Sequence, residues 1–231
     1  IDLYVTVCLI FILGVLMKIA IFLKTLIIFL ILINSLKARP VSYVGGWTLM
    51  SYNNYKNNSL LIHFTPSSKY SLGYNIEYWN EKEYWINNFN LNYLLKRINK
   101  KNSQANFYFK SGLGVLYSDF NENTEKKEYV AMLNFSTDWE TRRNFISYST
   151  ELIKSETVAN IFMQKARFGF APYLANYGEI HTWIMYELDY MSSSDNNLTY
   201  AAIFRFFKST NLLEVGMDEN RRILLNFIKR F

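Results

Sequence analysis

Histidine is the residue type in this chain best suited to acid–base chemistry, and only His63 and His181 are present. A histidine activates a serine only when the two side chains lie within hydrogen-bond reach. No serine stands in a recognisable nucleophile motif, and the run Ser192–Ser194 is typical of a solvated turn. We therefore predict no catalytic residue, with His181 the strongest candidate if there is one.

The spacing of possible metal ligands argues against a metal site. His181, Glu187 and Asp189 fall on one face of an alternating segment. A strand rises about 3.3 Å per residue, which places His181 and Glu187 about 20 Å apart. The acidic segment 119–125 lacks the glycine of a calcium-binding loop. The only cysteine is Cys8, so we predict neither a metal nor a cofactor.

Composition limits the classes of protein to which the chain can belong. Aromatic residues make up 18% of the chain, yet the mean hydropathy is −0.04. The net charge of +6 over 231 residues is mild, and no basic stripe of the kind that binds nucleic acid is present. After Leu36 no apolar run approaches the ~20 residues of a membrane-spanning helix. Neither nucleic-acid binding nor a bundle of membrane helices is expected.

Residues 17–38 have the pattern of a secretory signal peptide, in which a short basic region precedes an apolar core and a small residue. Met17 is the natural start, and we expect cleavage after Ala38. The alternative is a membrane anchor from Ile1 to Leu36, which is long enough to span a bilayer. We predict an upstream segment and signal peptide over residues 1–38 and a single domain over residues 39–231.

From Trp47 onward the chain alternates between apolar and polar residues, which is the period of β-strands. We count about twelve segments of roughly nine to eleven residues, the length at which a tilted strand crosses a bilayer. Ten strands is the alternative count. In two clear segments, large apolar residues alternate with a polar set, which is Ser71, Gly73, Asn75 and Glu77 in one and Asn88, Asn90 and Asn92 in the other. Periodicity alone does not tell which face is the inside.

The final segment, residues 222–231, has an apolar face that ends in Phe227 and Phe231. It resembles the C-terminal strand of outer-membrane β-barrel proteins of Gram-negative bacteria, and the resemblance covers nearly the whole chain after residue 38. Lys229 departs from the pattern, but its ammonium can reach the lipid head groups. Aromatic residues at strand ends also carry the resemblance: Trp79, Tyr93, Tyr117 and Tyr190.

The resemblance implies an all-β fold, a closed antiparallel transmembrane β-barrel in the bacterial outer membrane, preceded by an N-terminal signal helix. Its partners would be outer-membrane lipid and the barrel assembly machinery, for which Phe227 and Phe231 would be the assembly signal. The connections 118–127 and 191–197 would be the longest and lie outside the cell, with short turns at the periplasmic end. Polar residues expected to face the lumen are Glu77, Lys110, Lys165, Arg167, His181, Glu187, Asp189, Arg205, Glu214, Arg222 and Arg230.

Several functions remain open at this point. The favoured one is a pore, transport or structural role without chemistry. A lipid-acting enzyme that uses His181 and a soluble periplasmic ligand-binding barrel of lipocalin type are the alternatives. Eight strands leave room only for side chains and 16 to 18 leave a channel. A lumen of about twelve strands could therefore be an open pore or an interior filled by paired charges.

Overall fold

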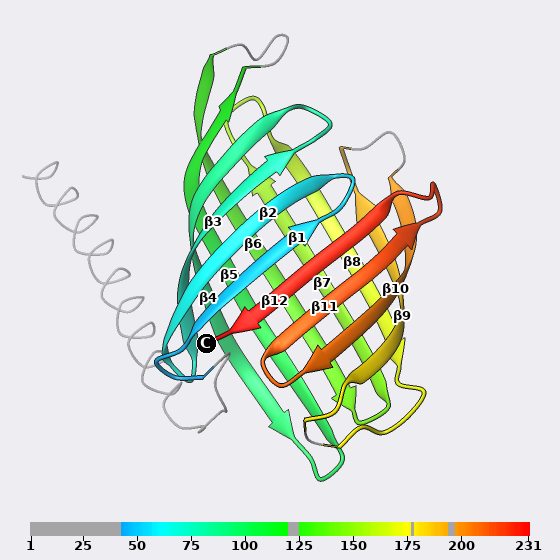
Figure 1. The fold of residues 1–231 in the computed structure, drawn as a ribbon. Helices are drawn as coiled ribbons and strands as arrows, with labels where there is room; N and C mark the ends of the chain where they lie inside the picture. The colour runs from blue at the N-terminus through cyan, green and yellow to red at the C-terminus, as the bar shows by residue number, and fades with distance from the viewer. Residues whose placement is uncertain (1–42, 120–124, 177, 194–196) are drawn as a thin grey trace, which may run out of the picture. The chain divides into compact units, whose positions relative to one another are not determined.

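The computed structural model describes residues 43–119, 125–176, 178–193 and 197–231. These residues form a closed antiparallel β-barrel, in which each strand pairs with its neighbours in sequence and β12 closes on β1 (Figure 1). The strands are β1 Trp47–Asn53, β2 Asn57–Ser67, β3 Tyr70–Trp79, β4 Tyr84–Asn99, β5 Ser103–Ser118, β6 Lys126–Thr141, β7 Asn144–Lys154, β8 Asn160–Phe170, β9 His181–Met191, β10 Leu198–Lys208, β11 Asn211–Asp218 and β12 Ile223–Arg230. The predicted barrel of twelve strands is confirmed, and the ten-strand alternative is wrong. The predicted signal peptide lies outside the described residues.

Three neighbouring strands are longer than the sequence pattern predicts. β4, β5 and β6 each contain 16 residues, whereas the remaining strands contain 7 to 11. The long strands pair with one another over most of their length, so each gains ladder hydrogen bonds beyond the ends of the shorter strands.

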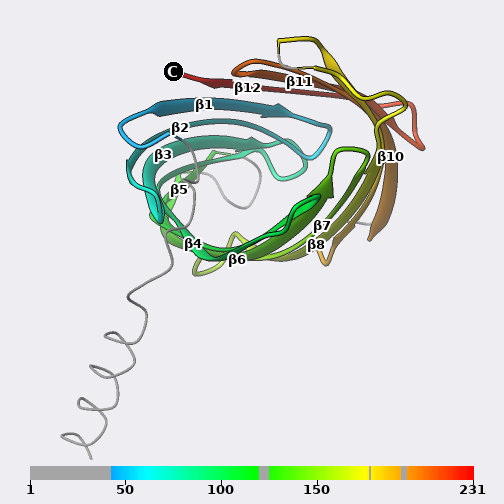
Figure 2. The same ribbon diagram turned by 90° about the horizontal axis from the view of Figure 1, so that it is seen from below.

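The strands are steeply tilted. Following paired residues once around the barrel, from β1 back to β1, shifts the register by about 14 residues. For twelve strands this shift corresponds to a tilt of about 40°. The tilt is visible in Figure 1, and Figure 2 shows the strands curving around the interior.

Large apolar residues cover the outside of the wall, while polar residues alternate with them on the inside. On β4, Phe89 is 73% exposed, whereas Asn88 beside it is fully buried at 0%. On β6, Tyr129 is 80% exposed, and exposed apolar residues recur on β2 to β12, whereas β1 has one, Trp47. A soluble lipocalin-type barrel would place its apolar residues inside, so that alternative is wrong.

The interior also contains two apolar clusters, one toward each end of the barrel. We call upper the end that carries the β1–β2 turn, and lower the end at which the last strand finishes, as in Figure 1. The upper cluster includes Trp79, Tyr84 and Leu116, and the lower cluster includes Trp183 and Met185. Trp79, which was predicted as an aromatic strand end, is the last residue of β3. Its side chain is buried, and its ring stacks on that of Tyr84 at 6.0 Å.

The lower end carries a longer connection than predicted. The segment between Phe170 and His181 exceeds both of the connections that were expected to be longest, which makes that prediction wrong. The segment is packed onto the barrel, because Ala171 and Ala175 are buried and Arg142 Nη2 donates a hydrogen bond to the carbonyl of Ala175 at 3.3 Å. Residues 120–124 of the acidic segment and Ser194 of the serine run lie outside the described residues. Among the described residues, none forms a helix long and apolar enough to cross a membrane.

Candidate pore interior

A cavity of about 570 Å³ occupies the inside of the barrel. Its lining includes Asn54 and Lys56 near the upper end and Asp138 and Arg230 near the lower end, so it extends along much of the barrel. A volume of this size falls within the range of small-molecule sites, which is about 300 to 1,000 Å³. The interior is therefore not completely filled by side chains.

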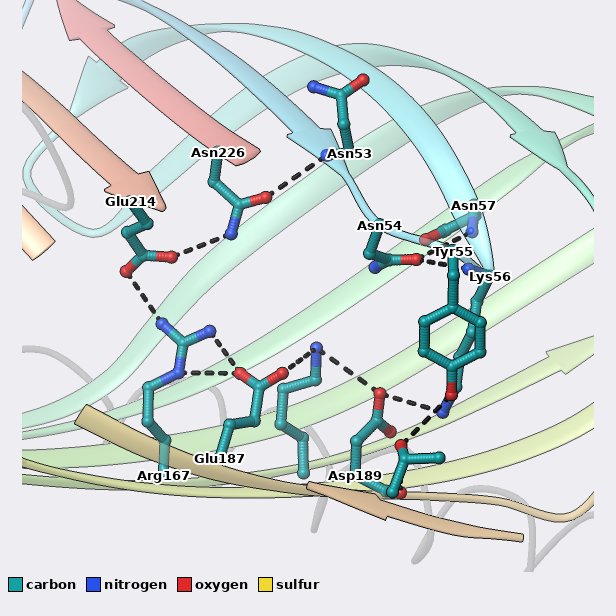
Figure 3. Close-up of polar contacts among 12 residues, drawn as sticks. Asn53, Asn54, Tyr55, Lys56, Asn57, Arg167, Glu187, Asp189, Glu214 and Asn226 are labelled. Carbon is teal, nitrogen blue, oxygen red and sulfur yellow. Dashed lines mark hydrogen bonds and ion pairs between the residues drawn. The ribbon is translucent and has the colours of Figure 1, made fainter. Parts of the chain in front are cut away.

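One wall of the cavity carries a chain of charged contacts, which we call the charged wall (Figure 3). It begins at Glu214 on β11. One oxygen of this carboxylate accepts hydrogen bonds from Arg205 Nε at 2.7 Å and Arg167 Nη1 at 2.9 Å. The other oxygen accepts one from Asn226 Nδ2 at 2.8 Å. One carboxylate thus links β8, β10 and β12.

The charged wall continues upward with alternating signs of charge. Arg167 also donates from Nε to Glu187 Oε2 at 2.8 Å. Lys165 Nζ lies 3.5 Å from Glu187 Oε1 and 3.9 Å from Asp189 Oδ2. Lys56 Nζ lies 3.0 Å from the same Asp189 oxygen, although the contact does not meet hydrogen-bond geometry. The four cations of this wall thus share three carboxylates, and each cation lies against at least one of them.

The β1–β2 turn supplies the last cation of this chain because it folds inward over the cavity. Asn54 Oδ1 accepts hydrogen bonds from the backbone N–H groups of Lys56 and Asn57 at 2.7 and 2.9 Å. The Tyr55 hydroxyl donates to Thr199 Oγ1 at 3.2 Å, and the Arg222 guanidinium lies 3.3 Å from the centre of the Tyr55 ring. The turn is therefore attached to the far side of the barrel by three side-chain contacts.

The facing wall is dominated by uncharged amides and hydroxyls, and we call it the amide wall. It is formed by Asn75, Asn88, Asn90, Asn92 and Asn134, together with inward serines on β5 to β7. Asn88 Nδ2 donates to Asn90 Oδ1 at 3.1 Å, and Asn92 Nδ2 donates to the Ser71 hydroxyl at 3.2 Å. Asn134 Nδ2 donates to Glu151 Oε2 at 3.3 Å.

Two glycines of β5 allow these amides to lie flat against the wall. A Cβ atom at Gly112 would collide with the side-chain amides of Asn88 and Asn90, and one at Gly114 would collide with the backbone of Asn88. Gly112 therefore leaves room for the amides at the centre of the amide wall, and Gly114 allows the close approach of the β4 backbone.

At the upper end, the β7–β8 connection is attached to β6 through Glu128. The Glu128 carboxylate accepts hydrogen bonds from the backbone N–H groups of Thr157 and Val158 at 2.9 and 3.1 Å, and from the hydroxyls of Ser155 and Thr157. Burial raises the pKa of Glu128, but these hydrogen bonds outweigh it and lower the pKa to about 2. Val158 and Ala159 pack into the upper apolar cluster.

The structure places the predicted lumen residues in four settings. Those that line the cavity are Glu77, Lys110, Lys165, Arg167, Asp189, Arg205 and Arg230. Glu187 and Glu214 are buried in the charged wall. Arg222 lies at the upper end and pairs with Asp218 at 2.6 Å.

His181 lies apart from these groups, at the lower start of β9. Its ring packs edge-on against Trp183 at 5.6 Å, and within the described part of the chain its Nε2 has no hydrogen-bond partner. His63 lies on β2, which is not adjacent to β9 in the barrel. The structure therefore brings His181 to no serine or carboxylate that could complete a catalytic pair.

Sequence reasoning missed Lys56, Glu128 and the amide wall. Lys56 lies in a segment that reads as an ordinary turn, and nothing in the sequence indicates that the turn folds inward. Glu128 gives no local signal, because its partners lie about 30 residues away. The alternating asparagines 88, 90 and 92 were a usable signal, since they fall on one strand face.

The fold and the interior together define a β-barrel of the transmembrane type, with an apolar outside, a polar inside and a central cavity. Among solved structures, the chain is similar to a KdgM porin in complex with disordered oligogalacturonate, with 10% identity, a TM-score of 0.49 and coverage of 80% of this chain and 98% of that one. It is also similar to OccK11 (OpdR) of Pseudomonas aeruginosa, with 6% identity, a TM-score of 0.41 and coverage of 83% of this chain and 68% of that one. No protein-family model and no curated protein matches the chain. Because these similarities are remote, the function rests on the residues of the barrel itself.

Proposed function

We propose that this protein is an integral outer-membrane β-barrel that forms a narrow pore for small polar solutes and performs no chemistry. The observation that carries the proposal is a closed barrel with an apolar outer face around a polar cavity of about 570 Å³. A closed barrel is the β-structure that can cross a membrane, because lipid offers no hydrogen-bond partners to open sheet edges.

The apolar outer face has the height of a bilayer core. Tyr129 and Trp139 lie on the outer face of β6, and their separation along a strand tilted by about 40° corresponds to about 25 Å of height. Lys127 lies two residues before Tyr129 on the same face, nearer the upper end, and its ammonium lies 6.0 Å from the centre of the Tyr117 ring. A change from aromatic to cationic side chains is expected where a barrel meets the head groups.

The balance of charge inside the cavity favours uncharged or zwitterionic solutes. The basic side chains of the lining are Lys56, Lys110, Lys165, Arg167, Arg205 and Arg230. They are matched in number by carboxylates that line the cavity or lie directly behind it: Glu77, Asp138, Glu151, Asp189, Glu187 and Glu214. A lining without a dominant sign of charge produces little selection between anions and cations.

Two measurements test the proposal. Protein refolded into detergent should migrate faster on a gel when unheated than after boiling, as a stable barrel does. The same preparation in planar bilayers should give discrete current steps with weak selectivity between K⁺ and Cl⁻. A barrel with heat-modifiable migration but no current would favour the second candidate, a structural barrel closed by the inward β1–β2 turn.

The enzyme alternative has a direct test of its own. Lipid hydrolysis by the refolded protein that disappears in His181→Ala, with heat-modifiable migration retained, would overturn the proposal that no chemistry takes place. We expect wild type and His181→Ala to be equally inactive toward phospholipid vesicles.

A further inference from the structure

We propose that the amide wall is a binding site for uncharged polyhydroxylated solutes, of which small neutral saccharides are the simplest examples. The inference rests on the proposed function and deepens it, because it assigns a class of solute to one wall of the pore. In the charged wall opposite, every cation lies against a carboxylate, and the wall serves mainly as a structural brace.

The first argument is a set of polar atoms with unused hydrogen-bonding capacity on this wall. Among the described residues, Asn75 Oδ1, Asn134 Oδ1 and Ser136 Oγ are buried side-chain atoms without a hydrogen-bond partner. All three residues line the cavity. A buried polar atom without a partner costs free energy. These atoms are covered in the empty cavity, so a side-chain rotation that turns them toward a ligand donor would recover that cost.

The second argument is the chemistry of the carboxamide. An asparagine side chain carries a donor and an acceptor side by side. Of two neighbouring hydroxyls of a saccharide, one can donate to the amide oxygen and the other can accept from the amide nitrogen. Asn75, Asn90, Asn92 and Asn134 present this pattern from β3, β4 and β6, and hydroxyls from Ser111, Ser136, Ser147 and Ser149 extend it.

The third argument is the shape of the wall. Because Gly112 has no side chain, the amides of Asn88 and Asn90 lie over it rather than projecting into the cavity. A flat, hydrogen-bonding surface suits the edge of a sugar ring. Tyr108 also lines the cavity and supplies aromatic surface for the apolar parts of such a ring.

The charged groups on this side do not favour an ionic solute. Glu77 accepts hydrogen bonds from Asn75 and from Trp79 Nε1, the latter at 3.0 Å. Glu151 accepts one from Asn134 at 3.3 Å. Lys110 exposes its ammonium to the cavity, but Glu151 and Asp138 lie close enough to attract it. Both of these carboxylates are thus hydrogen-bonded within the amide wall, which leaves amides and hydroxyls for a ligand.

The test is titration calorimetry of the folded protein in detergent micelles with maltotriose as the probe. We expect maltotriose to bind, and we expect gluconate and glucosamine to bind at least about tenfold more weakly. The double variant Asn90→Leu/Asn134→Leu should weaken maltotriose binding by about tenfold or more, since at least two hydrogen bonds are lost. Asn87→Leu is the matched control, because Asn87 lies on the same strand with its side chain bonded to outward Tyr74, and it should leave binding unchanged.

A second variant keeps the test decisive if the double variant fails to fold. Ser136→Ala removes one unpaired hydroxyl with little change of volume and should weaken binding measurably while heat-modifiable migration is retained. No heat of binding from folded wild type, or equal binding by wild type and the variants, would overturn the inference. Planar-bilayer current is measured separately. Current without saccharide binding would reject this site and retain the pore. Saccharide binding without current would retain the site and reject the pore.

Discussion

At the scale of single residues, Glu214 of β11 is bonded to three further strands. Its carboxylate accepts from Arg167, Arg205 and Asn226, which belong to β8, β10 and β12. The side chain is buried at 3% exposure. Loss of one member of a buried ionic network leaves its partners without compensation, which costs more than the complete network contributes.

Glu214→Gln tests this role, because the amide keeps the shape and removes the charge. We expect the free energy of unfolding to fall by about 3 kcal/mol, since two arginines lose their common counter-ion. Urea unfolding in lipid vesicles, followed by tryptophan fluorescence, measures the change. Glu81→Gln is the control because Glu81 is exposed in the β3–β4 turn, and equal stability of the two variants would contradict the expectation.

At the scale of elements, the two upper connections that fold onto the barrel are held by different forces. The β1–β2 turn is attached by the ion pair between Lys56 and Asp189 at 3.0 Å. The β7–β8 connection is attached by four hydrogen bonds to Glu128. Breaking the Lys56–Asp189 ion pair should change the entrance to the cavity. Breaking the hydrogen bonds to Glu128 should free the Ser155–Ala159 segment.

Lys56→Met removes the ion pair of the β1–β2 turn. We expect larger or more frequently fluctuating single-channel currents, because the turn no longer bonds to Asp189 across the cavity. Lys82→Met is a charge-matched control in the exposed β3–β4 turn at the same end of the barrel. Traces of Lys56→Met that cannot be distinguished from those of Lys82→Met would show that the turn does not control the current.

The β7–β8 connection should depend on pH. The pKa of Glu128 is lowered from 4.5 to about 2 in the folded protein. The stabilisation is therefore complete above about pH 4.5 and is lost as the pH falls toward 2. Amide hydrogen exchange of Thr157 and Val158, corrected for intrinsic rates, should lose protection between pH 5 and pH 2. In Glu128→Gln the protection should be low at both pH values. Constant protection of the wild-type protein between pH 5 and pH 2 would show that ionised Glu128 does not hold this connection.

At the scale of the whole molecule, the apolar outer face makes the barrel a membrane protein. Phe89 lies midway between Trp85 and Tyr93 along β4, and its ring packs 5.1 Å from that of Tyr74. Tyr129 lies at the upper margin of the same face. The two positions should therefore differ in their tolerance of charge.

Phe89→Arg should destabilise the barrel in lipid vesicles by about 2 to 4 kcal/mol, because the charge is placed near the middle of the bilayer. Tyr129→Arg should cost only about 0 to 1 kcal/mol, because its guanidinium reaches the head groups. Equal costs at the two positions, or no cost in vesicles, would mean that the outer face does not lie in lipid.

How much of this barrel was predictable depends on the range of each interaction. Alternation along Tyr70–Tyr78 and Asn88–Leu95 is a local property, so the sequence indicated the strands and the residues that share a face. The closed barrel and the choice of the inner face came from the resemblance to outer-membrane barrels. The Lys56–Asp189 contact and the Glu128 contacts join distant segments through turn geometry, which leaves no local pattern. Trp79 was predicted as an aromatic strand end and is the last residue of β3, and the alternation along that strand places its side chain inside.

The charged wall has a mechanical consequence. Its contacts tie β8, β9, β10, β11 and β12 to one another and to the β1–β2 turn. The contacts of the amide wall join mainly adjacent strands and act over shorter spans. One half of the barrel is therefore braced and the other half compliant. A solute slightly wider than the cavity would be accommodated by bending of β3 to β6, while the braced half keeps its curvature.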